Sequence, residues 1–189
     1  MKTKFKLLKI AGFILTLLLL VQCTAIGPGI SYSSTENYFE NALDGTGLPL
    51  KYSTTGPWEL GLTFVAHKNG VIKSINIKNP ELGNKRVSIW DTNNRVLITS
   101  FEYRTDSDKF YQKNLLNFKV EKGRTYTISF NATKYYYYEL FFKKLPMSDD
   151  NLTLLSTNFT PGTWQQLPDK QIDNIIHGLI DIDFEWEIY

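Results

Sequence analysis

The sequence predicts an all-β domain, an antiparallel β-sandwich of jelly-roll type. Hydrophobic residues recur at every second position rather than at the helical period of 3.6. Turn residues separate these segments about every 8–12 residues, a spacing typical of sandwiches. The candidate strands are residues 60–66, 71–78, 85–91, 95–103, 115–120, 124–131, 135–143 and 179–188.

The first of these strands shows the pattern clearly. Leu60, Leu62, Phe64 and Ala66 share one parity, as on the core side of a half-buried strand. The pair Asn69-Gly70 follows directly. Because Asn-Gly readily adopts positive φ, it predicts a tight hairpin to the next strand.

The last strand has the most regular alternation. Its apolar positions are Ile180, Ile182, Phe184, Trp186 and Ile188. Its acidic positions are Asp181, Asp183, Glu185 and Glu187. A slip of one residue would bury four carboxylates, so the register is fixed and the acidic face is predicted to be solvated.

The N-terminus resembles a bacterial lipoprotein signal. A basic segment is followed by an apolar run over residues 10–21, which ends just before Cys23, the only cysteine. A predominantly apolar run of twelve residues suits a secretory leader, which needs roughly 7–15, and is too short for a membrane-spanning helix of about 20. We expect lipidation of Cys23 and a lipid-anchored location in the bacterial cell envelope, with the outer membrane favoured. A plain signal peptide stays an alternative, because Gln22 is bulkier than the residue usually found before a lipidated cysteine.

Three regions are therefore expected: a signal peptide over 1–22, a flexible tether over 23–38 and the sandwich domain over 39–189. The tether prediction rests on a segment rich in Gly, Ser and Thr without an apolar period. Residues 149–178 lack a clear pattern and are expected to contain a short strand, a turn of helix and a long loop.

Charge and cysteine content exclude several classes of protein. The formal charge is +2, but four lysines and no acidic residue lie in the first 22 residues, so the remainder carries −2. Nucleic acid is therefore not an expected partner. With a single cysteine, neither an intramolecular disulfide nor a thiolate zinc cluster is available.

The sequence predicts no catalytic residues. The two histidines, His67 and His177, lie near turns, and no Gly-x-Ser-x-Gly elbow is present. No cofactor or metal is expected apart from a possible structural calcium ion. Its candidate oxygen ligands are Asp106, Asp108, Asp149 and Asp150, whose spacing does not match a calcium loop.

Aromatic residues are the better candidates for a binding site. In the run Tyr135 to Tyr138, alternation places Tyr135 and Tyr137 on one face. Glu139 continues that parity, so we predict these two rings outward and Tyr136 and Tyr138 inward. Outward tyrosines can stack on sugars or on an extended peptide, although tyrosine is also common on ordinary strand surfaces.

Three further residues complete the tentative ligand-binding set: Trp164, Gln165 and Trp90. Trp164 lies in a Pro-Gly-containing turn, where it could present its indole beside the Gln165 amide, or act as a lid on the core edge. Trp90 has the opposite parity to Ile89 and is expected to point outward, whereas Trp58 and Trp186 are predicted to be core residues.

Residues 59–130 resemble the domain of unknown function DUF4082. The matching motifs are Glu59-Leu60-Gly61-Leu62-Thr63-Phe64, Gly70-Val71-Ile72, Val87-Ser88-Ile89-Trp90-Asp91, Arg95-Val96-Leu97-Ile98, Leu116-Asn117-Phe118 and Gly123-Arg124-Thr125-Tyr126. The chain departs from the family between residues 108 and 114, where it has Phe110-Tyr111 in place of Gly-Trp. The resemblance implies a sandwich similar to carbohydrate-binding modules.

Three functions are compatible with these patterns. The first is a non-catalytic, lipid-anchored module that binds a glycan or a partner protein of the envelope. The second is a structural or assembly subunit of an envelope complex that pairs through an open sheet edge. The third is a hydrolase.

Overall fold

The computed structural model describes residues 31–35, 37–43, 47–107, 112–140, 145–172 and 174–188. The predicted signal peptide and Cys23 lie outside these residues. The strands and helix of the described part are β1 (Ser31–Thr35), α2 (Tyr38–Leu43), β2 (Lys51–Ser53), β3 (Trp58–Ala66), β4 (Gly70–Ile77), β5 (Gly83–Asp91), β6 (Val96–Thr105), β7 (Gln112–Val120), β8 (Thr125–Ala132), β9 (Tyr135–Glu139), β10 (Met147–Ser148), β11 (Leu152–Pro161), β12 (Lys170–Gln171), β13 (Ile175–His177) and β14 (Ile180–Ile188).

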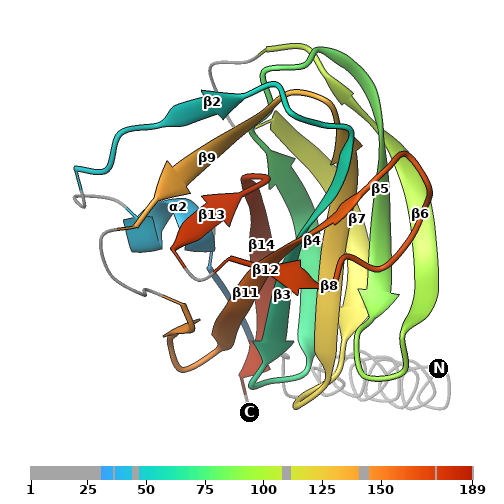
Figure 1. Ribbon diagram of the computed structural model, residues 1–189. Helices are drawn as coiled ribbons and strands as arrows, with labels where there is room; N and C mark the ends of the chain where they lie inside the picture. Colours follow the sequence, from blue (N-terminus) through green and yellow to red (C-terminus); the bar gives the residue numbers. More distant parts are fainter. Residues whose placement is uncertain are drawn as a thin grey trace, which may run out of the picture. The chain divides into compact units, whose positions relative to one another are not determined.

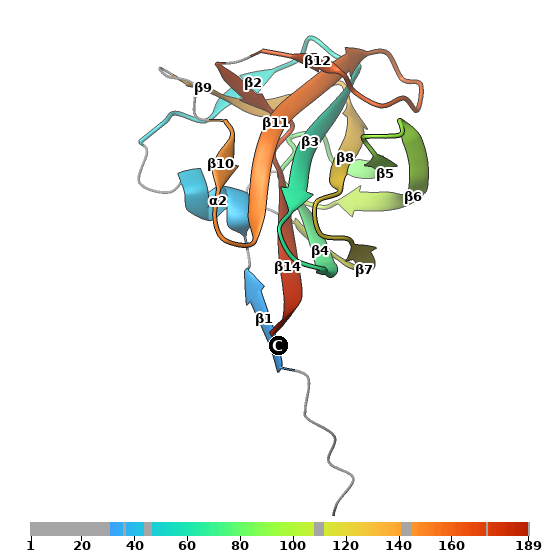
Figure 2. The same cartoon turned by 90° about the horizontal axis from the view of Figure 1, so that it is seen from below.

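Two antiparallel sheets pack face to face, which confirms the predicted β-sandwich. The four-stranded sheet has the order β1-β14-β4-β7, and the large sheet has the order β10-β11-β3-β8-β5-β6, with β12 beside β11. Figure 2 shows these two layers, with β14, β4 and β7 on one side and β11, β3 and β8 on the other. The connections β3–β4, β4–β5, β6–β7 and β7–β8 cross between the layers, whereas β5 and β6 pair within the large sheet. The four-stranded order β1-β14-β4-β7 and the order β3-β8-β5-β6 are those of a jelly roll.

A third, small sheet has the order β13-β9-β2. It is an insertion between β8 and β14 that recruits β2 from the N-terminal part of the chain. Figure 1 shows its three strands side by side at one end of the sandwich, at the upper left. This sheet creates the candidate site described below.

Alternating apolar residues build the core between the two main layers. Leu60, Leu62, Phe64 and Ala66 of β3 are buried as predicted. The ring of Phe64 stacks on that of Tyr126 from β8 at 5.8 Å between centroids. Since large rings bury the most apolar area per residue, these aromatic contacts compensate for the absence of an intramolecular disulfide.

The predicted hairpin at Asn69-Gly70 is wrong. β3 belongs to the large sheet and β4 to the four-stranded sheet, so this connection crosses between layers. A side chain at Gly70 would place its Cβ 2.3 Å from the carbonyl oxygen of Glu185 on β14. Glycine is therefore required here for close packing of strands. The Asn69 side chain accepts a hydrogen bond from the Lys122 backbone N–H at 2.8 Å, in the turn before β8.

The acidic face of β14 is only partly solvated, which corrects the prediction. Asp181 is fully buried and Asp183 is 4% exposed, because the segment around α2 covers them. Asp181 accepts backbone N–H groups of Phe39 and Glu40 at 2.8 Å each. Asp183 accepts the Asn37 N–H at 3.1 Å and a hydrogen bond from the Ser74 hydroxyl. These carboxylates hold the N-terminal end of α2 against the sheet.

The predicted tether over 23–38 is too long. Residues 31–35 form β1 beside β14, and Tyr38 lies in the core, where its hydroxyl donates to the Leu152 carbonyl oxygen at 3.0 Å. The segment Ser31–Thr35 has no apolar alternation, so only its pairing with β14 makes it a strand. Residues 149–178 also differ from expectation: their main element is the ten-residue strand β11, and no helix occurs in their described part.

Candidate functional site

One face of the small sheet gathers aromatic and polar side chains. Tyr137 of β9 lies between Lys51 of β2 and His177 of β13 in the antiparallel register. Tyr135 lies opposite Ser53 on the same face. Residues directly opposite each other on neighbouring strands present their side chains to the same side. The ladder therefore aligns Tyr135, Tyr137 and Glu139 with His177.

This face forms a pocket against the inner side of the large sheet. The pocket has a volume of about 390 Å³. Its walls from the large sheet are Trp58 and Leu60 of β3 and Phe159 of β11. Its other walls are Ser53, Tyr135, Tyr137, Glu139, Ile172, Ile175 and His177. The volume falls within the range of small-molecule sites, about 300–1,000 Å³.

The aromatic walls of the pocket contact one another at defined angles. Trp58 meets Phe159 edge to face, with 5.4 Å between centroids and an interplanar angle of 79°. The ring centroids of Phe159 and His177 lie 5.2 Å apart, with an interplanar angle of 64°. Those of Tyr135 and Tyr137 lie 6.3 Å apart, with an interplanar angle of 53°. These contacts hold the rings in place without a ligand, and preorganised rings lose little entropy on binding.

Three hydroxyl groups, of Ser53, Thr55 and Tyr135, lie together beside the Trp58 indole at the edge of the pocket. The hydroxyl oxygen of Thr55 is the centre of this group. It accepts a hydrogen bond from the Trp58 indole N–H at 3.3 Å and lies 3.3 Å from the Tyr135 hydroxyl. It also lies 3.0 Å from the Ser53 hydroxyl. The pocket thus combines an apolar interior with polar groups that can orient a ligand.

The charges near the pocket cancel. Glu139 is the one carboxylate among the described lining residues, and it forms an ion pair with Lys51. His177 is 4% exposed, and burial lowers its pKa to about 4. The imidazole is therefore neutral at pH 7.

The structure assigns the four tyrosines of β9 to two faces but not to two degrees of burial. Tyr135 and Tyr137 line the pocket together, as their common parity requires. Tyr136 and Tyr138 pack against the core, but Tyr135 of the other pair does so too, and all four rings are half-buried. The predicted contrast between exposed and fully buried pairs is therefore wrong in degree. The reason is that β9 lies in a small sheet at the end of the sandwich, where neither face is fully covered.

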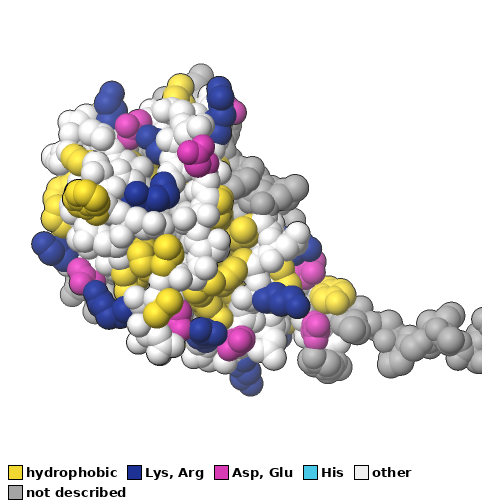
Figure 3. Space-filling model, turned by 90° about the vertical axis from the view of Figure 1, so that its right-hand side faces the viewer, with side chains coloured by type: hydrophobic (Ala, Val, Ile, Leu, Met, Phe, Trp, Pro, Cys, Tyr) yellow, Lys and Arg dark blue, Asp and Glu magenta, His cyan; other side chains and the backbone are white. Residues whose placement is uncertain are grey.

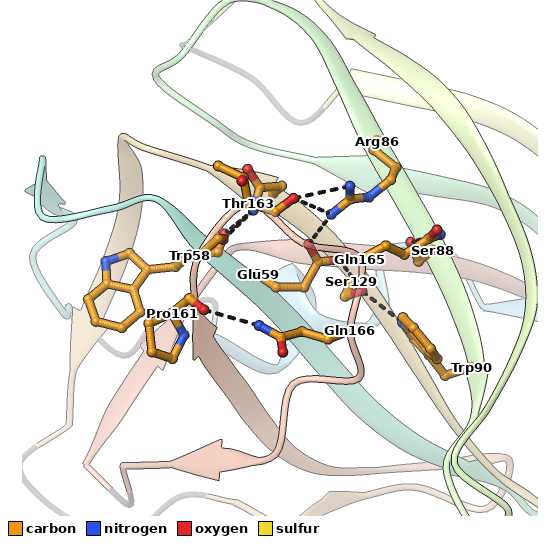
Figure 4. Close-up of polar contacts among 12 residues, drawn as sticks. Trp58, Glu59, Arg86, Ser88, Trp90, Ser129, Pro161, Thr163, Gln165 and Gln166 are labelled. Carbon is orange, nitrogen blue, oxygen red and sulfur yellow. Dashed lines mark hydrogen bonds and ion pairs between the residues drawn. The ribbon is translucent and has the colours of Figure 1, made fainter.

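Trp164, Gln165 and Trp90 lie apart from the pocket, on the outer face of the large sheet. A segment over residues 161–169, here called the strap, lies on this face (Figure 4). Gln165 donates to the Ser88 hydroxyl at 3.0 Å, and a Cβ at Gly61 would meet the Pro168 ring at 2.6 Å. The Trp164 side chain is 80% exposed. The predicted ligand-binding residues are thus divided between two faces.

Trp90 points outward from β5 as predicted, but it is not available on the surface. It is 6% exposed, and its indole N–H donates to the Ser129 hydroxyl at 3.0 Å. Ser129 donates in turn to the buried carboxylate of Glu59 at 2.8 Å. Trp90 is therefore outward in the pleat but enclosed by polar side chains beneath the strap, so its ring face is not open to a ligand in this structure.

That polar layer fixes the strap to the sheet. Arg86 donates to Glu59 at 2.7 Å and to the backbone carbonyl oxygen of Thr163 at 3.2 Å (Figure 4). Asn131 donates to the Gly162 carbonyl oxygen at 2.9 Å. Burial raises the pKa of Glu59, while Ser129 and Arg86 oppose that shift. The strap is therefore held by Arg86, which Glu59 orients, and by Asn131, both of which donate to its backbone carbonyls on the N-terminal side of Trp164.

Sequence reasoning missed three pocket residues. Trp58 was predicted to be core, but it is half-buried at the pocket wall. Phe159 lies on β11, which has a register shift between Leu154 and Ser156 that breaks the alternation. His177 was recognised only as one of two histidines near turns. Its proximity to Tyr137 arises from β9–β13 pairing, which no local pattern indicates.

The predicted calcium ligands do not converge in the described chain. Asp108 lies outside the described residues. Asp106 pairs with Arg104 at 2.6 Å, and the Asp149 carboxylate accepts the N–H groups of Asn151 and Leu152 at 2.6 and 2.7 Å. Among the residues that the structure describes, no three His, Cys, Asp or Glu side chains form a group suited to a metal ion.

No protein-family model and no curated protein matches the chain. The resemblance to DUF4082 therefore stays a prediction. Within the described ranges, no helix has the length and apolar character needed to cross a membrane.

Proposed function

We propose that this chain is a lipid-anchored, non-catalytic envelope protein whose sandwich binds a glycan in the aromatic pocket. The pocket formed by Trp58, Tyr135, Tyr137 and Phe159 is the observation that supports this function best. Sugar rings present C–H faces that stack on aromatic rings and hydroxyls that need polar partners. The pocket offers both, because hydroxyl groups centred on Thr55 lie beside its aromatic walls.

The charge arrangement supports binding rather than hydrolysis. Hydrolysis of a glycosidic bond typically needs two carboxyl groups about 5–10 Å apart on either side of the bond. Glu139 is the single carboxylate among the described lining residues, and it is engaged in an ion pair with Lys51. Among the described lining residues, a glycan in this pocket therefore meets one ion-paired carboxylate and no second carboxyl group.

The anchoring part of the proposal rests on the sequence. The apolar run over residues 10–21 and the single cysteine after it support lipid attachment at Cys23. Two or more acyl chains would make attachment effectively permanent, at about 0.8 kcal/mol for each buried methylene. In this proposal the sandwich presents its pocket to glycans of the cell envelope.

The binding claim is tested with three alanine variants on a glycan array of neutral, amino and acidic oligosaccharides. Trp58→Ala and Tyr137→Ala should each weaken binding by at least about tenfold, because each removes a ring that stacks on the sugar. Aromatic stacking contributes on the order of 1 kcal/mol or more per ring. Trp164→Ala is the matched control, because that indole is exposed on the other face. Absence of binding by the wild-type chain, or equal loss in the Trp164 variant, would refute the proposed site.

A second function, assembly through a sheet edge, is favoured by β6. This ten-residue strand forms one edge of the large sheet and exposes Val96, Leu97 and Ile98 at 55%, 36% and 41%. Figure 3 shows hydrophobic side chains gathered on this side of the molecule. A long edge strand with exposed apolar residues is a template for pairing with another chain.

Photo-cross-linking in cells distinguishes the two functions. A cross-linker at position 98 should trap one stoichiometric protein partner if β6 serves assembly. The same group at position 119, on the exposed side of β7 in the other sheet, is the control. Equal and diffuse products at both positions would remove the assembly function and leave glycan binding as the sole proposal.

A further inference from the structure

A histidine in the pocket wall carries a buried hydrogen-bonding atom that has no partner among the residues that the structure describes. His177 lines the pocket and is 4% exposed, and its Nε2 atom makes no hydrogen bond within these residues. Its other ring nitrogen, Nδ1, lies 3.3 Å from the hydroxyl oxygen of Thr157. Most buried polar side-chain atoms in proteins have a partner, so this nitrogen requires an explanation.

The contacts of Thr157 determine which nitrogen carries the proton. The Thr157 hydroxyl has one hydrogen, which it donates to the Ile175 carbonyl oxygen at 3.2 Å. It can then only accept from His177, so Nδ1 carries the ring proton. Nε2 is left as a lone-pair acceptor. Because burial keeps the imidazole neutral at pH 7, this acceptor persists in the folded protein.

Backbone pairing fixes where His177 lies, and its ring is held by the Thr157 hydroxyl and by an edge contact with Phe159. β13 is paired with β9, which places His177 opposite Tyr137. Gly178 follows with a φ of +65°, and a side chain there would place its Cβ 2.6 Å from that of Leu60. The Gly178 N–H also donates to the Tyr136 carbonyl oxygen at 3.3 Å. The imidazole is thus positioned before any ligand arrives.

We infer that His177 Nε2 selects an uncharged saccharide by accepting a hydrogen bond from one of its hydroxyl groups. The inference rests on the proposed glycan-binding function and narrows its ligand class. Among the described residues no cation lines the pocket and the neighbouring Lys51 is paired with Glu139, so a ligand carboxylate would be desolvated there without a compensating charge. A ligand lacking the matching hydroxyl would leave Nε2 unpaired, so the pocket discriminates by hydrogen-bond chemistry as well as by shape.

The test uses ligand-observed NMR on the chain that begins at residue 23, after the predicted signal peptide. The probes are methyl glycosides of glucose, galactose, mannose and N-acetylglucosamine, each with its single-position deoxy analogues, and methyl glucuronide. For the bound sugar, one deoxy position should weaken binding by about tenfold, the ratio expected from one net hydrogen bond. The variant His177→Phe keeps a flat ring but removes the acceptor. It should bind the parent glycoside more weakly than the wild type does, and it should bind the parent and the sensitive deoxy analogue with equal affinity.

A second readout is independent of the variant's folding. In ¹⁵N NMR spectra of the wild-type chain, the ring of His177 should be the Nδ1–H tautomer, and its Nε2 resonance should move when the parent glycoside is added. An Nε2–H tautomer, or an unchanged deoxy profile in His177→Phe, would overturn the inference while leaving glycan binding intact. Failure of every glycoside and oligosaccharide to bind would instead overturn the proposed function and this inference with it.

Discussion

Comparison of the wild-type chain with His177→Phe as a function of pH reports directly on the buried imidazole. Burial lowers the pKa of His177 from 6.5 to about 4. Between these two values the unfolded chain binds a proton that the folded protein does not. The stabilisation due to the neutral imidazole is therefore fully present above about pH 6.5 and is lost as the pH falls toward 4.

The magnitude follows from the same two values. A tenfold change in proton affinity corresponds to about 1.4 kcal/mol, so the lowering from 6.5 to about 4 is on the order of 3 kcal/mol of unfolding free energy. Asp181 titrates in the opposite sense. Burial raises its pKa from 3.8 to about 7, so its folded form gains stability as the pH falls through this range. Only the difference between wild type and variant isolates His177.

Urea unfolding followed by tryptophan fluorescence gives the free energies at pH 7.5, 6.0, 5.0 and 4.0. The wild-type value should decrease relative to the variant by on the order of 3 kcal/mol from pH 7.5 to 4.0. The urea m-values should stay equal, because the same surface is exposed on unfolding. Parallel stability curves for the two proteins would show that His177 titrates normally, and the argument from its burial would be refuted.

Three further predictions address the fold and the anchor. Asp181→Ala should lower the unfolding free energy by about 2–4 kcal/mol, because buried backbone N–H groups of Phe39 and Glu40 lose their acceptor. The control Glu185→Ala removes only a partly exposed ion pair and should cost under about 1 kcal/mol in the same denaturation assay. Gly70→Ala should cost about 1–3 kcal/mol, since the new Cβ would lie 2.3 Å from the Glu185 carbonyl oxygen; a change like that of the exposed Ser100→Ala, within about 0.5 kcal/mol, would contradict the close approach of these strands. Cys23→Ser should release the protein from the membrane fraction or stall its processing, and recovery of normally cleaved protein in that fraction at the wild-type level would exclude lipid anchoring at this residue.

Local alternation was sufficient to predict most of the sandwich. β3 and β14 keep strict parity over nine residues each, so their core faces could be assigned from the sequence. β11 could not be predicted in the same way, because a register shift after Leu154 changes its parity in mid-strand. The burial of Asp181 and Asp183 was likewise unpredictable from β14 alone. It depends on α2, which lies about 140 residues earlier in the chain and covers their face.

The candidate site was only half predictable for a similar reason. The parity of β9 correctly grouped Tyr135 with Tyr137. The opposite wall comes from Trp58 and Phe159, and its buried acceptor from His177, all brought together by pairing across three segments of the chain. Trp164 and Gln165 satisfied the same compositional criteria for a sugar platform. Their position on the strap follows from contacts of Arg86 and Ser88, which the sequence does not reveal.

The central claim is that the aromatic pocket binds a glycan. The most direct test follows the indole N–H resonances of the four tryptophans while an oligosaccharide that binds on the glycan array is added to the protein. Trp58 lines the pocket, Trp90 and Trp186 are buried elsewhere, and Trp164 is exposed on the strap. We predict a saturable shift of the Trp58 resonance, with the other three unchanged. A saturable shift of Trp164 with Trp58 unchanged would place the ligand on the outer face of the large sheet and contradict the account.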